Sequence, residues 1–436
     1  MPPSAPRDCP PDLLATAVSK VKAHVLPLFI GMFILNYIDR VNIGFVKKHI
    51  LQDLQIDLEA FGFGAGLFFI GYALFEVPSN MLLQRVGARA WLTRITFTWG
   101  LAATLMAFIR DKNQFYALRF LLGVAEAGFF PGVIYYFTRW LPQAERGKAT
   151  ALFLSGSAIA SILSGPLSGA LLQNPAFGFK GWQWMFLVEG LASVLLGGVV
   201  WKWLDSRPED ARWLTEPEKA ALLRAIETDQ RPAAALQHAP LRTLLRDPQI
   251  LLFCLIYFAI QLTIYAATFW LPSIIGKIGA LSDFQIGLLN SIPWTISILA
   301  MYGFAAAAAR WRFQQAWVCA ALLIAAAGMF LSTRGTPLFA FAAVCFAAVG
   351  FKAASSLFWP IPQGYLDARI AAPVLALINS LGNLGGAVAP ATFGVLEKRT
   401  GSIQGGLYGL AIASLLAAAL VFLTRTRPSP STPPTS

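Results

Sequence analysis

The stretch that decides the fold is Val25–Val46, VLPLFIGMFILNYIDRVNIGFV, an apolar run that contains two adjacent charges. About 20 apolar residues cross the hydrocarbon core of a bilayer as a helix. Asp39 and Arg40 lie inside this run, and a charged side chain at membrane depth is costly and usually functional. The alternative is that the span ends near Tyr37 and that both charges lie at the interface. Because NIGFV continues the apolar pattern, we favour the buried placement.

The composition is that of an integral membrane protein. Of the 436 residues, 56% are hydrophobic and 13% are charged, whereas about 25% of the residues in a soluble protein are charged. Hydropathy predicts an all-α membrane protein with twelve transmembrane helices. The predicted spans are 25–46, 61–83, 90–109, 114–138, 147–172, 182–204, 249–275, 283–309, 313–333, 336–366, 370–396 and 402–424.

The spans fall into two groups of six. The predicted units are an N-terminal tail (1–24), a six-helix bundle (25–204), a charged linker (205–248), a second six-helix bundle (249–426) and a tail that we expect to be disordered (427–436). Thr215 and Glu218 form a capping box ahead of a short apolar stripe, which predicts a helix inside the linker. Two repeated halves of this kind are typical of a transporter.

Small residues recur at a spacing of four in two spans that occupy equivalent positions in the two halves. They are Gly165 and Gly169 in the fifth span and Gly382 and Gly386 in the eleventh. Small residues at this spacing let helix backbones approach closely in a membrane. The pattern therefore predicts helix packing and a pseudo-symmetric relation between the bundles.

The positive charge indicates the orientation. The net charge is +12, but in a membrane protein the placement of Lys and Arg matters more than their sum. These residues concentrate in the N-terminal tail, in the loop at 84–94 and in the 205–248 linker, which lie on one side of the predicted spans. The positive-inside rule then places both termini in the cytoplasm, in a multi-pass protein of the cell's inner membrane. No cleaved signal sequence is evident.

Seven ionisable residues lie within the predicted spans: Asp39, Arg40, Glu76, Arg119, Glu126, Glu189 and Lys352. Arg119 and Glu126 are seven residues apart, so they share a helix face with about 10 Å of rise between them. Arginine suits a carboxylate because its planar fork donates two parallel hydrogen bonds. We favour a role for this pair in one cavity over a structural salt bridge. For Glu76, which shares a face with Tyr72, and for Glu189 we favour structural hydrogen bonding.

Lys352 is the unusual charge of the second half. Lys352, Ser356 and Trp359 share one face of the tenth span, and Pro360 then interrupts the helix. Irregular backbone at membrane depth is tolerated where it lines a cavity. Lys352 either faces that cavity or extends its ammonium group to the interface, and the sequence leaves both interpretations open.

Several motifs together resemble the anion:cation symporter family of the major facilitator superfamily. They are NYIDRVNIG in the first span, GYALFEVPSNMLLQRVGARAWLTR around the second, RFLLGVAEAGFFPGV in the fourth, DARWLTEPEK in the linker, FWPIP in the tenth and INSLGNLGG in the eleventh. The resemblance covers about residues 25–425. That family includes bacterial phthalate, tartrate and sugar-acid permeases and the animal vesicular glutamate and sialic acid transporters. RVGAR lacks the Asp of the general superfamily loop motif, as this family's version usually does.

The resemblance implies an organic-anion carrier with a major facilitator fold and a central cavity between its halves. Arg40 and Arg119 match the family positions that hold the substrate carboxylate, and Asp39 and Glu126 match the proton-coupling acids. The remaining candidate substrate-binding residues are Tyr37, Tyr72, Ser157, Ser356, Trp359 and Asn379. Some sugar-acid carriers have a longer amide in place of Ser157, which indicates a shorter or different substrate. Lys352 has no counterpart expected throughout the family, and in the cavity it would favour a dicarboxylate.

We expect a secondary active transporter of a dicarboxylate or hydroxy acid such as tartrate, working by alternating access with proton symport. The alternatives are exchange of one dicarboxylate for another, symport of a sugar acid, a non-transporting solute sensor, a membrane enzyme and a multidrug exporter. The three histidines lie in tails and loops and the four cysteines lie far apart, so we predict no cofactor and no metal site. The expected partners are a small organic anion, protons and the bilayer, without nucleic acid, and the expected state is a monomer.

Overall fold

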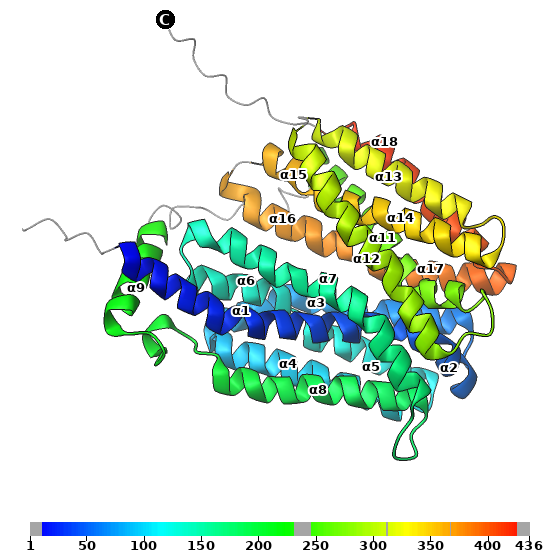
Figure 1. The fold of residues 1–436 in the computed structure, drawn as a ribbon, viewed down its shortest axis with the longest axis horizontal. Coiled ribbons are helices and arrows are strands. Elements are labelled where there is room, and N and C mark those ends of the chain that lie inside the picture. Colours follow the sequence, from blue (N-terminus) through cyan, green and yellow to red (C-terminus); the bar gives the residue numbers. More distant parts are fainter. Residues whose placement is uncertain (1–10, 231–245, 311–312, 367, 425–436) are drawn as a thin grey trace, which may run out of the picture.

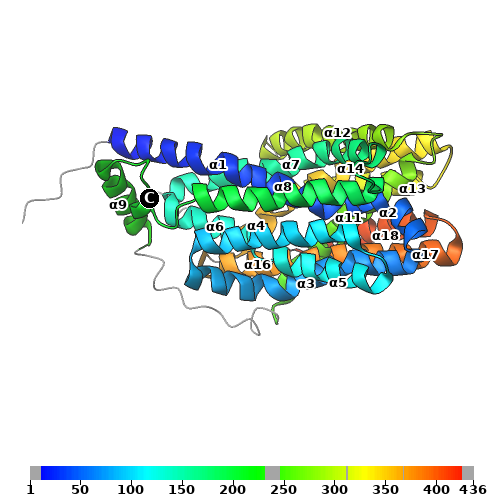
Figure 2. The ribbon, with the colours of Figure 1, turned by 90° about the horizontal axis from the view of Figure 1, so that it is seen from below.

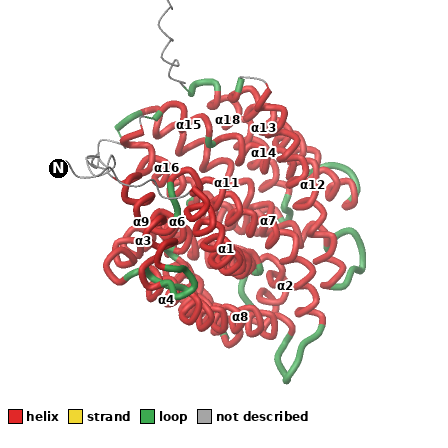
Figure 3. Tube along the Cα trace, turned by 60° about the vertical axis from the view of Figure 1, so that its left-hand side comes forward, coloured by secondary structure: helices red, strands yellow, loops and turns green. Residues whose placement is uncertain are grey.

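A computed structural model describes residues 11–230, 246–310, 313–366 and 368–424, and these residues form helices without any strand (Figures 1 and 3). The helices are α1 (Pro11–Val41), α2 (Ile43–Asp53), α3 (Leu58–Val86), α4 (Ala88–Leu105), α5 (Lys112–Glu126), α6 (Phe129–Trp140), α7 (Gln143–Gln173), α8 (Gly181–Trp203), α9 (Glu216–Gln230), α11 (Pro248–Ile275), α12 (Asp283–Arg310), α13 (Gln314–Leu331), α14 (Pro337–Phe358), α15 (Pro360–Tyr365), α16 (Ala368–Asn383), α17 (Gly385–Thr400) and α18 (Gln404–Val421).

The helices correspond to the twelve predicted spans. Ten segments are long and apolar enough to cross a membrane, and α4 and the α16–α17 pair supply the third and the eleventh spans. Four spans are broken, between α1 and α2, α5 and α6, α14 and α15, and α16 and α17. The second break requires Gly128, whose φ of +89° suits glycine and whose Cβ would lie 2.4 Å from Ser79 Oγ.

The two halves, α1–α8 and α11–α18, lie side by side (Figures 1 and 2). They meet where α3 packs on α17 and where α7 packs on α12. A Cβ on Gly62 would lie 2.2 Å from Pro390 O, and one on Gly165 would lie 2.2 Å from Gly287 O. These backbone contacts confirm the close packing that the small residues predicted, and they place much of it between the halves.

The linker forms the predicted helix. Thr215 N donates to Glu218 Oε2 at 2.9 Å, and Leu222 and Ile226 are buried. Helix α1 begins at Pro11, so the second part of the expected N-terminal tail is helical, and it packs against α9 (Figure 2). Lys20 Nζ lies 2.7 Å from Glu218 Oε1 and holds the pKa of that carboxyl below its usual range. The tail predicted at 427–436 lies outside the described residues.

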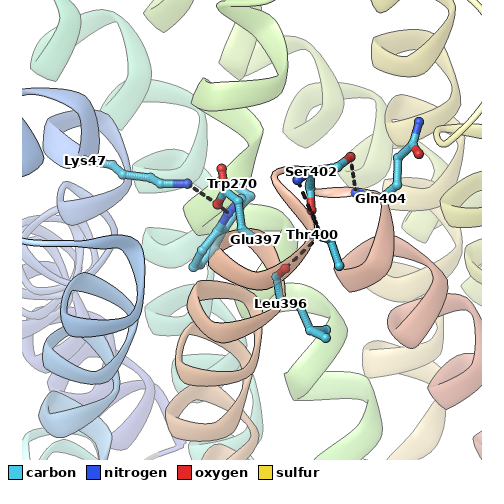
Figure 4. A network of polar contacts seen from close by, with 7 residues as sticks. All are labelled: Lys47, Trp270, Leu396, Glu397, Thr400, Ser402 and Gln404. Atoms are coloured by element: carbon cyan, nitrogen blue, oxygen red, sulfur yellow. Dashed lines mark hydrogen bonds and ion pairs between the residues drawn. The ribbon is translucent and has the colours of Figure 1, made fainter.

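Ion pairs join the halves at the distal end, which we define as the end formed by α2 and by residues 276–282 and 401–403, opposite α9 (Figure 1). Lys47 Nζ of α2 lies 2.6 Å from Glu397 Oε2 of α17. Figure 4 shows this contact as a dashed line. Trp270 of α11 donates its Nε1–H to the same oxygen at 2.7 Å, and its ring centroid lies 4.5 Å from the ammonium nitrogen. We call Lys47, Trp270 and Glu397 the distal tie.

Further ionisable side chains surround the distal tie. Lys398 Nζ lies 2.8 Å from both Asp57 Oδ2 and Glu59 Oε2, and His49 lies 3.5 Å from Asp283. In the described part of the chain, all the ion pairs between the two halves lie at this end. The distal end is therefore the side on which the halves are held together.

Candidate functional site

Arg40 and Glu126 form an ion pair inside the first half, next to the second half. Each lies beside a helix break, Arg40 near the end of α1 and Glu126 as the last residue of α5. Arg40 Nη2 contacts Glu126 Oε1, while Arg40 Nη1 donates to the hydroxyl of Tyr265 on α11 at 3.3 Å. The Glu126 side chain is fully buried, and 12% of the Arg40 side chain is exposed. A cation of one half thus touches the other half directly.

Aromatic rings flank the two arginines of the first half. The Arg40 guanidinium lies 5.1 Å from the ring centroid of Tyr72 and 5.3 Å from that of Phe68, and the Arg119 guanidinium lies 5.1 Å from the same Phe68 ring. Cation–π contacts of this length are attractive, and more so where water is excluded. The structure therefore brings Arg40, Arg119, Tyr72 and Glu126, four of the candidate site residues, into one cluster.

Arg119 is buried without a carboxylate partner. Its Nη2 donates to Ala65 O at 3.2 Å, whereas its Nε and Nη1 have no hydrogen-bond partner among the described residues. Glu126 is bonded to Arg40 instead, so the structural salt bridge considered for Arg119 and Glu126 is not formed. A buried guanidinium with free donors is suited to an anionic ligand.

Asp39 points away from this cluster although it precedes Arg40 in the chain. Its Oδ2 accepts hydrogen bonds from Trp99 Nε1 at 3.1 Å and from Ser193 Oγ at 2.9 Å. Successive residues of a helix point about 100° apart, so the two neighbours face different helices. Asp39 and Glu126, which both match the family's proton-coupling acids, therefore have different hydrogen-bond partners.

Glu76 and Glu189 both make the inter-helix hydrogen bonds expected of them. Glu76 Oε2 accepts from Ser380 Oγ of α16 at 2.6 Å, which is a contact between the halves. Glu189 accepts from Asn42 Nδ2 at 2.8 Å and from Ser168 Oγ at 2.9 Å.

Lys352 lies inside the second half. Its Nζ is 5.5 Å from the ring centroid of Trp294 on α12, and no carboxylate of the described residues lies within 4.0 Å of it. Trp294 is 3% exposed and lines, together with Tyr37 of α1 and Asn290, a cavity of about 10 Å³, which is space for one water. The ammonium group therefore lies against the ring that faces the first half, which favours the cavity interpretation.

The other predicted residues are not joined to Arg40 by contacts in the described structure. Trp359 stands at the break after α14, with its ring centroid 4.7 Å from that of Tyr257. Ser157 Oγ donates to Leu154 O of its own helix at 2.9 Å. Ser356 and Asn379 are half-buried, and their side chains have no hydrogen bond among the described residues.

Sequence reasoning missed Tyr265, Phe68 and Trp294. Each lies in a strongly apolar run with several other aromatic residues, and nothing in the sequence separates them from aromatic residues that only pack. A hydroxyl on a ring in the seventh span was the one available signal for Tyr265, and Tyr257 carries the same signal.

Comparison with known proteins gives a consistent result. The family model described as Major Facilitator Superfamily matches residues 28–390. An Agrobacterium vitis protein provisionally named a tartrate transporter is 39% identical over 421 residues, which cover 96% of this chain and 96% of the relative. A quinolone resistance transporter of Acinetobacter baumannii is 40% identical over 94% of this chain and 95% of its own length.

A solved structure has the same fold. It is a bacterial homologue of the human lysosomal transporter Spinster, in an inward-facing and occupied conformation, with a TM-score of 0.76, 17% identity, and coverage of 94% of this chain and 99% of that one. The fold of two six-helix bundles is thereby confirmed, and both fold and family are those of membrane transporters. The chain belongs to the Major Facilitator Superfamily.

Proposed function

We propose that this protein carries small organic anions, with dicarboxylates such as tartrate as the leading class, across the inner membrane of a bacterium by alternating access. The observation that carries the proposal is the buried Arg40–Glu126 pair, which reaches the second half through Tyr265 and lies beside the partly unpaired Arg119. The relatives named for tartrate transport support the choice of substrate class.

Glu126 couples proton binding to anion binding through competition for Arg40. While Glu126 is ionised, it occupies the guanidinium fork that a substrate carboxylate would take. A proton on Glu126 removes its charge and releases the fork, and the arriving carboxylate then restores the charge balance. One proton and one carboxylate therefore bind together, which is what symport requires.

Lys352 selects for a second carboxylate. Arg40 and Arg119 hold one end of the substrate in the first half, and the ammonium group over Trp294 receives the other end from the second half. A dicarboxylate bridges the halves in this way, whereas a monocarboxylate sugar acid leaves the Lys352 charge without a partner. The same three cations are compatible with dicarboxylate exchange, in which Glu126 only balances charge while the site is empty.

The distal end faces the outside of the cell in this proposal. We assign the opposite end, and both termini, to the cytoplasm because Lys and Arg concentrate in the linker and in the loop at 84–94. With this orientation, the ion pairs between the halves lie on the outer side, which supports a state closed to the outside.

A second candidate substrate class is aromatic carboxylates. The relative named for quinolone resistance favours it, because quinolones carry a carboxylate on a fused aromatic ring. The rings of Phe68 and Tyr72 beside Arg40 would stack on such a molecule.

Transport by the purified protein in liposomes tests the proposal. Radiolabelled tartrate uptake is measured under an imposed inward proton gradient and, separately, into vesicles preloaded with unlabelled tartrate. Accumulation driven by the proton gradient supports symport. Uptake only into preloaded vesicles identifies an exchanger. Without uptake in either case tartrate is refuted, and competition by a quinolone or a sugar acid then identifies the substrate class.

A further inference from the structure

The break between α5 and α6, directly after Glu126, is held by a side chain of α3. Ser79 is 5% exposed, and its Oγ donates to the main-chain oxygen of Ala127 at 2.6 Å. Gly128, the next residue, has a positive φ and approaches Ser79 so closely that a Cβ on it would lie 2.4 Å from Ser79 Oγ. Ser79 therefore lies against the two residues that follow Glu126.

The Ala127 oxygen needs this donor because its own helix cannot supply one. In a continuous helix the oxygen would accept from the N–H of residue 131, but Pro131 has no N–H. A ψ of 131° at Ala127 also turns its carbonyl group away from the helical direction. An unpaired backbone oxygen at membrane depth is unfavourable. Ser79 thus stabilises the broken conformation, which is the one that Pro131 favours.

Two donors from α4 orient the Ser79 hydroxyl group. Trp91 Nε1 lies 3.1 Å from Ser79 Oγ, and Arg94 Nη2 lies 3.4 Å from it. A hydroxyl group has one proton to donate and two lone pairs that accept. Because Trp91 and Arg94 occupy the lone pairs, the proton of Ser79 is directed to Ala127.

Arg94 is close to no acid that would take its charge. No carboxylate of the described residues lies within 4.0 Å of its guanidinium group. That group lies 4.0 Å from the ring centroid of Trp91, and its Nε is buried without a hydrogen-bond partner in the described part of the chain. A charged donor strengthens a hydrogen bond. Ser79 therefore receives from Arg94 the charge-assisted bond that an acid would otherwise receive.

We propose that Ser79, oriented by Trp91 and Arg94, is a positioning residue that holds the Glu126 carboxyl group against Arg40 by fixing the break after α5. Glu126 is the last residue of α5 and Ala127 follows it, so a rotation at the break moves Glu126 relative to Arg40. The start of α4 is thereby connected to the anion site through one hydroxyl group.

Labelling of Glu126 by a hydrophobic carbodiimide tests this positioning without any substrate. The reagent reacts with protonated carboxyl groups inside membranes, and mass spectrometry of the purified protein measures the labelling of each acid. The ion pair with Arg40 disfavours the reaction at Glu126. We expect S79A to raise the labelling of Glu126 about two- to tenfold, the range that corresponds to one net hydrogen bond.

Glu189 is the internal reference for this experiment, because its hydrogen-bond donors Asn42 and Ser168 lie on other helices than Ser79. Its labelling should stay at the wild-type level in S79A. Unchanged labelling of Glu126, or an equal rise at Glu189, overturns the proposal.

S332A is the matched control variant. Ser332 is also 5% exposed and also donates to a main-chain oxygen, that of Met329 at 2.7 Å, but it lies in the second half. S332A should leave the labelling of Glu126 unchanged, and a rise equal to that in S79A overturns the proposal.

W91F guards against an S79A protein that does not fold. It keeps an aromatic ring and removes one of the two donors to Ser79. We expect it to raise the labelling of Glu126 by less than S79A does. No rise in W91F contradicts the orientation of Ser79 by Trp91 and overturns the proposal.

The effect on the anion site rests on the proposed function and is tested separately, by tartrate binding to the purified protein at high pH. S79A is introduced into the wild type and into E126Q, which forms a double-mutant cycle. If Ser79 acts through Glu126, S79A raises the tartrate affinity about two- to tenfold in the wild type and leaves it unchanged in E126Q. A merely structural residue changes the affinity by the same factor in both, and that result overturns the positioning role. Protein that binds no tartrate refutes the proposed substrate, whereas the carbodiimide labelling still tests Ser79.

Discussion

Removing the charge of Glu397 should open the distal end. In the closed state Lys47 is 4% exposed, and its ammonium group has Glu397 as its carboxylate partner. E397Q retains an oxygen that can accept from Trp270 Nε1 but leaves the Lys47 charge buried without its counter-ion. When the halves separate, water can solvate that charge. The substitution therefore destabilises the closed state selectively.

The size of the effect follows from burial. Removing one partner of a fully buried pair costs about 3–5 kcal/mol. Because 17% of the Glu397 side chain is exposed, we reduce this to about 2–3 kcal/mol for the distal tie. At about 1.4 kcal/mol per tenfold, the ratio of open to closed protein should rise roughly 30- to 150-fold. An open population of about 1% would then reach about a quarter or more.

The assay is a distance measurement between spin labels on the two halves. Labels at Q52C and R399C, two exposed distal positions, are introduced into a background without the native cysteines. E397Q should add a long-distance population that the wild type lacks. K398A is the matched control, because its partners are about half exposed and exposed ion pairs contribute about 0–1 kcal/mol.

The double variant K47Q/E397Q distinguishes two causes of opening: the loss of attraction between the halves and the burial of an unpaired Lys47 charge. It removes both charges, so it should populate the open state less than E397Q does. An E397Q distance distribution equal to that of the wild type, or a shift in K398A as large as in E397Q, would refute the reasoning.

Three further predictions concern the site, the pH dependence and the packing between halves. K352Q should weaken the binding of dicarboxylates by about tenfold or more, because a charge-assisted hydrogen bond contributes about 1.5–3 kcal/mol. The binding of monocarboxylates should change little. Competition against bound radiolabelled tartrate measures both affinities. Lys398 lowers the pKa of the Asp57 carboxyl below its ordinary value. The stabilising contribution of this pair is therefore present above about pH 4 and is lost as the pH falls through the lowered pKa. The thermal unfolding midpoints of D57N and the wild type should converge in acid. G62A should lower the midpoint of thermal unfolding, because the new Cβ would lie 2.2 Å from a backbone oxygen of the other half. The control G198A, whose Cβ would have no atom within 4 Å, should be neutral or slightly stabilising.

Hydropathy was sufficient to predict most of the fold, because a bilayer requires long apolar helices whatever their neighbours. Local sequence signals predicted two further features: Pro360 marked the break after Trp359, and the capping box marked the start of α9. The break beside Arg40 has no proline, whereas the break beside Glu126 contains Gly128 and is followed by Pro131. The position of the break beside Arg40 depends on tertiary contacts such as the hydrogen bond from Asn42 to Glu189.

The site was predicted at the level of residues but not of partners. Local periodicity placed Arg119 and Glu126 on one face, yet Glu126 bonds to Arg40, 86 positions away. The distal tie joins residues 350 positions apart. Pairings at such separations are set by how helices pack, which one sequence does not reveal. The different directions of Asp39 and Arg40 follow from helix geometry, but which of them faces the other half does not.

The competition between Glu126 and the substrate for Arg40 is tested most directly by tartrate binding to the purified protein across a pH range. If one proton is taken up with each anion, the association constant of the wild type for tartrate should fall tenfold per pH unit once the pH exceeds the pKa of the group that takes up the proton. In E126Q the Arg40 fork has lost its charged competitor, so the slope should be smaller by one proton, with tight binding retained at high pH. The same slope in E126Q as in the wild type would contradict a role for Glu126 in releasing Arg40.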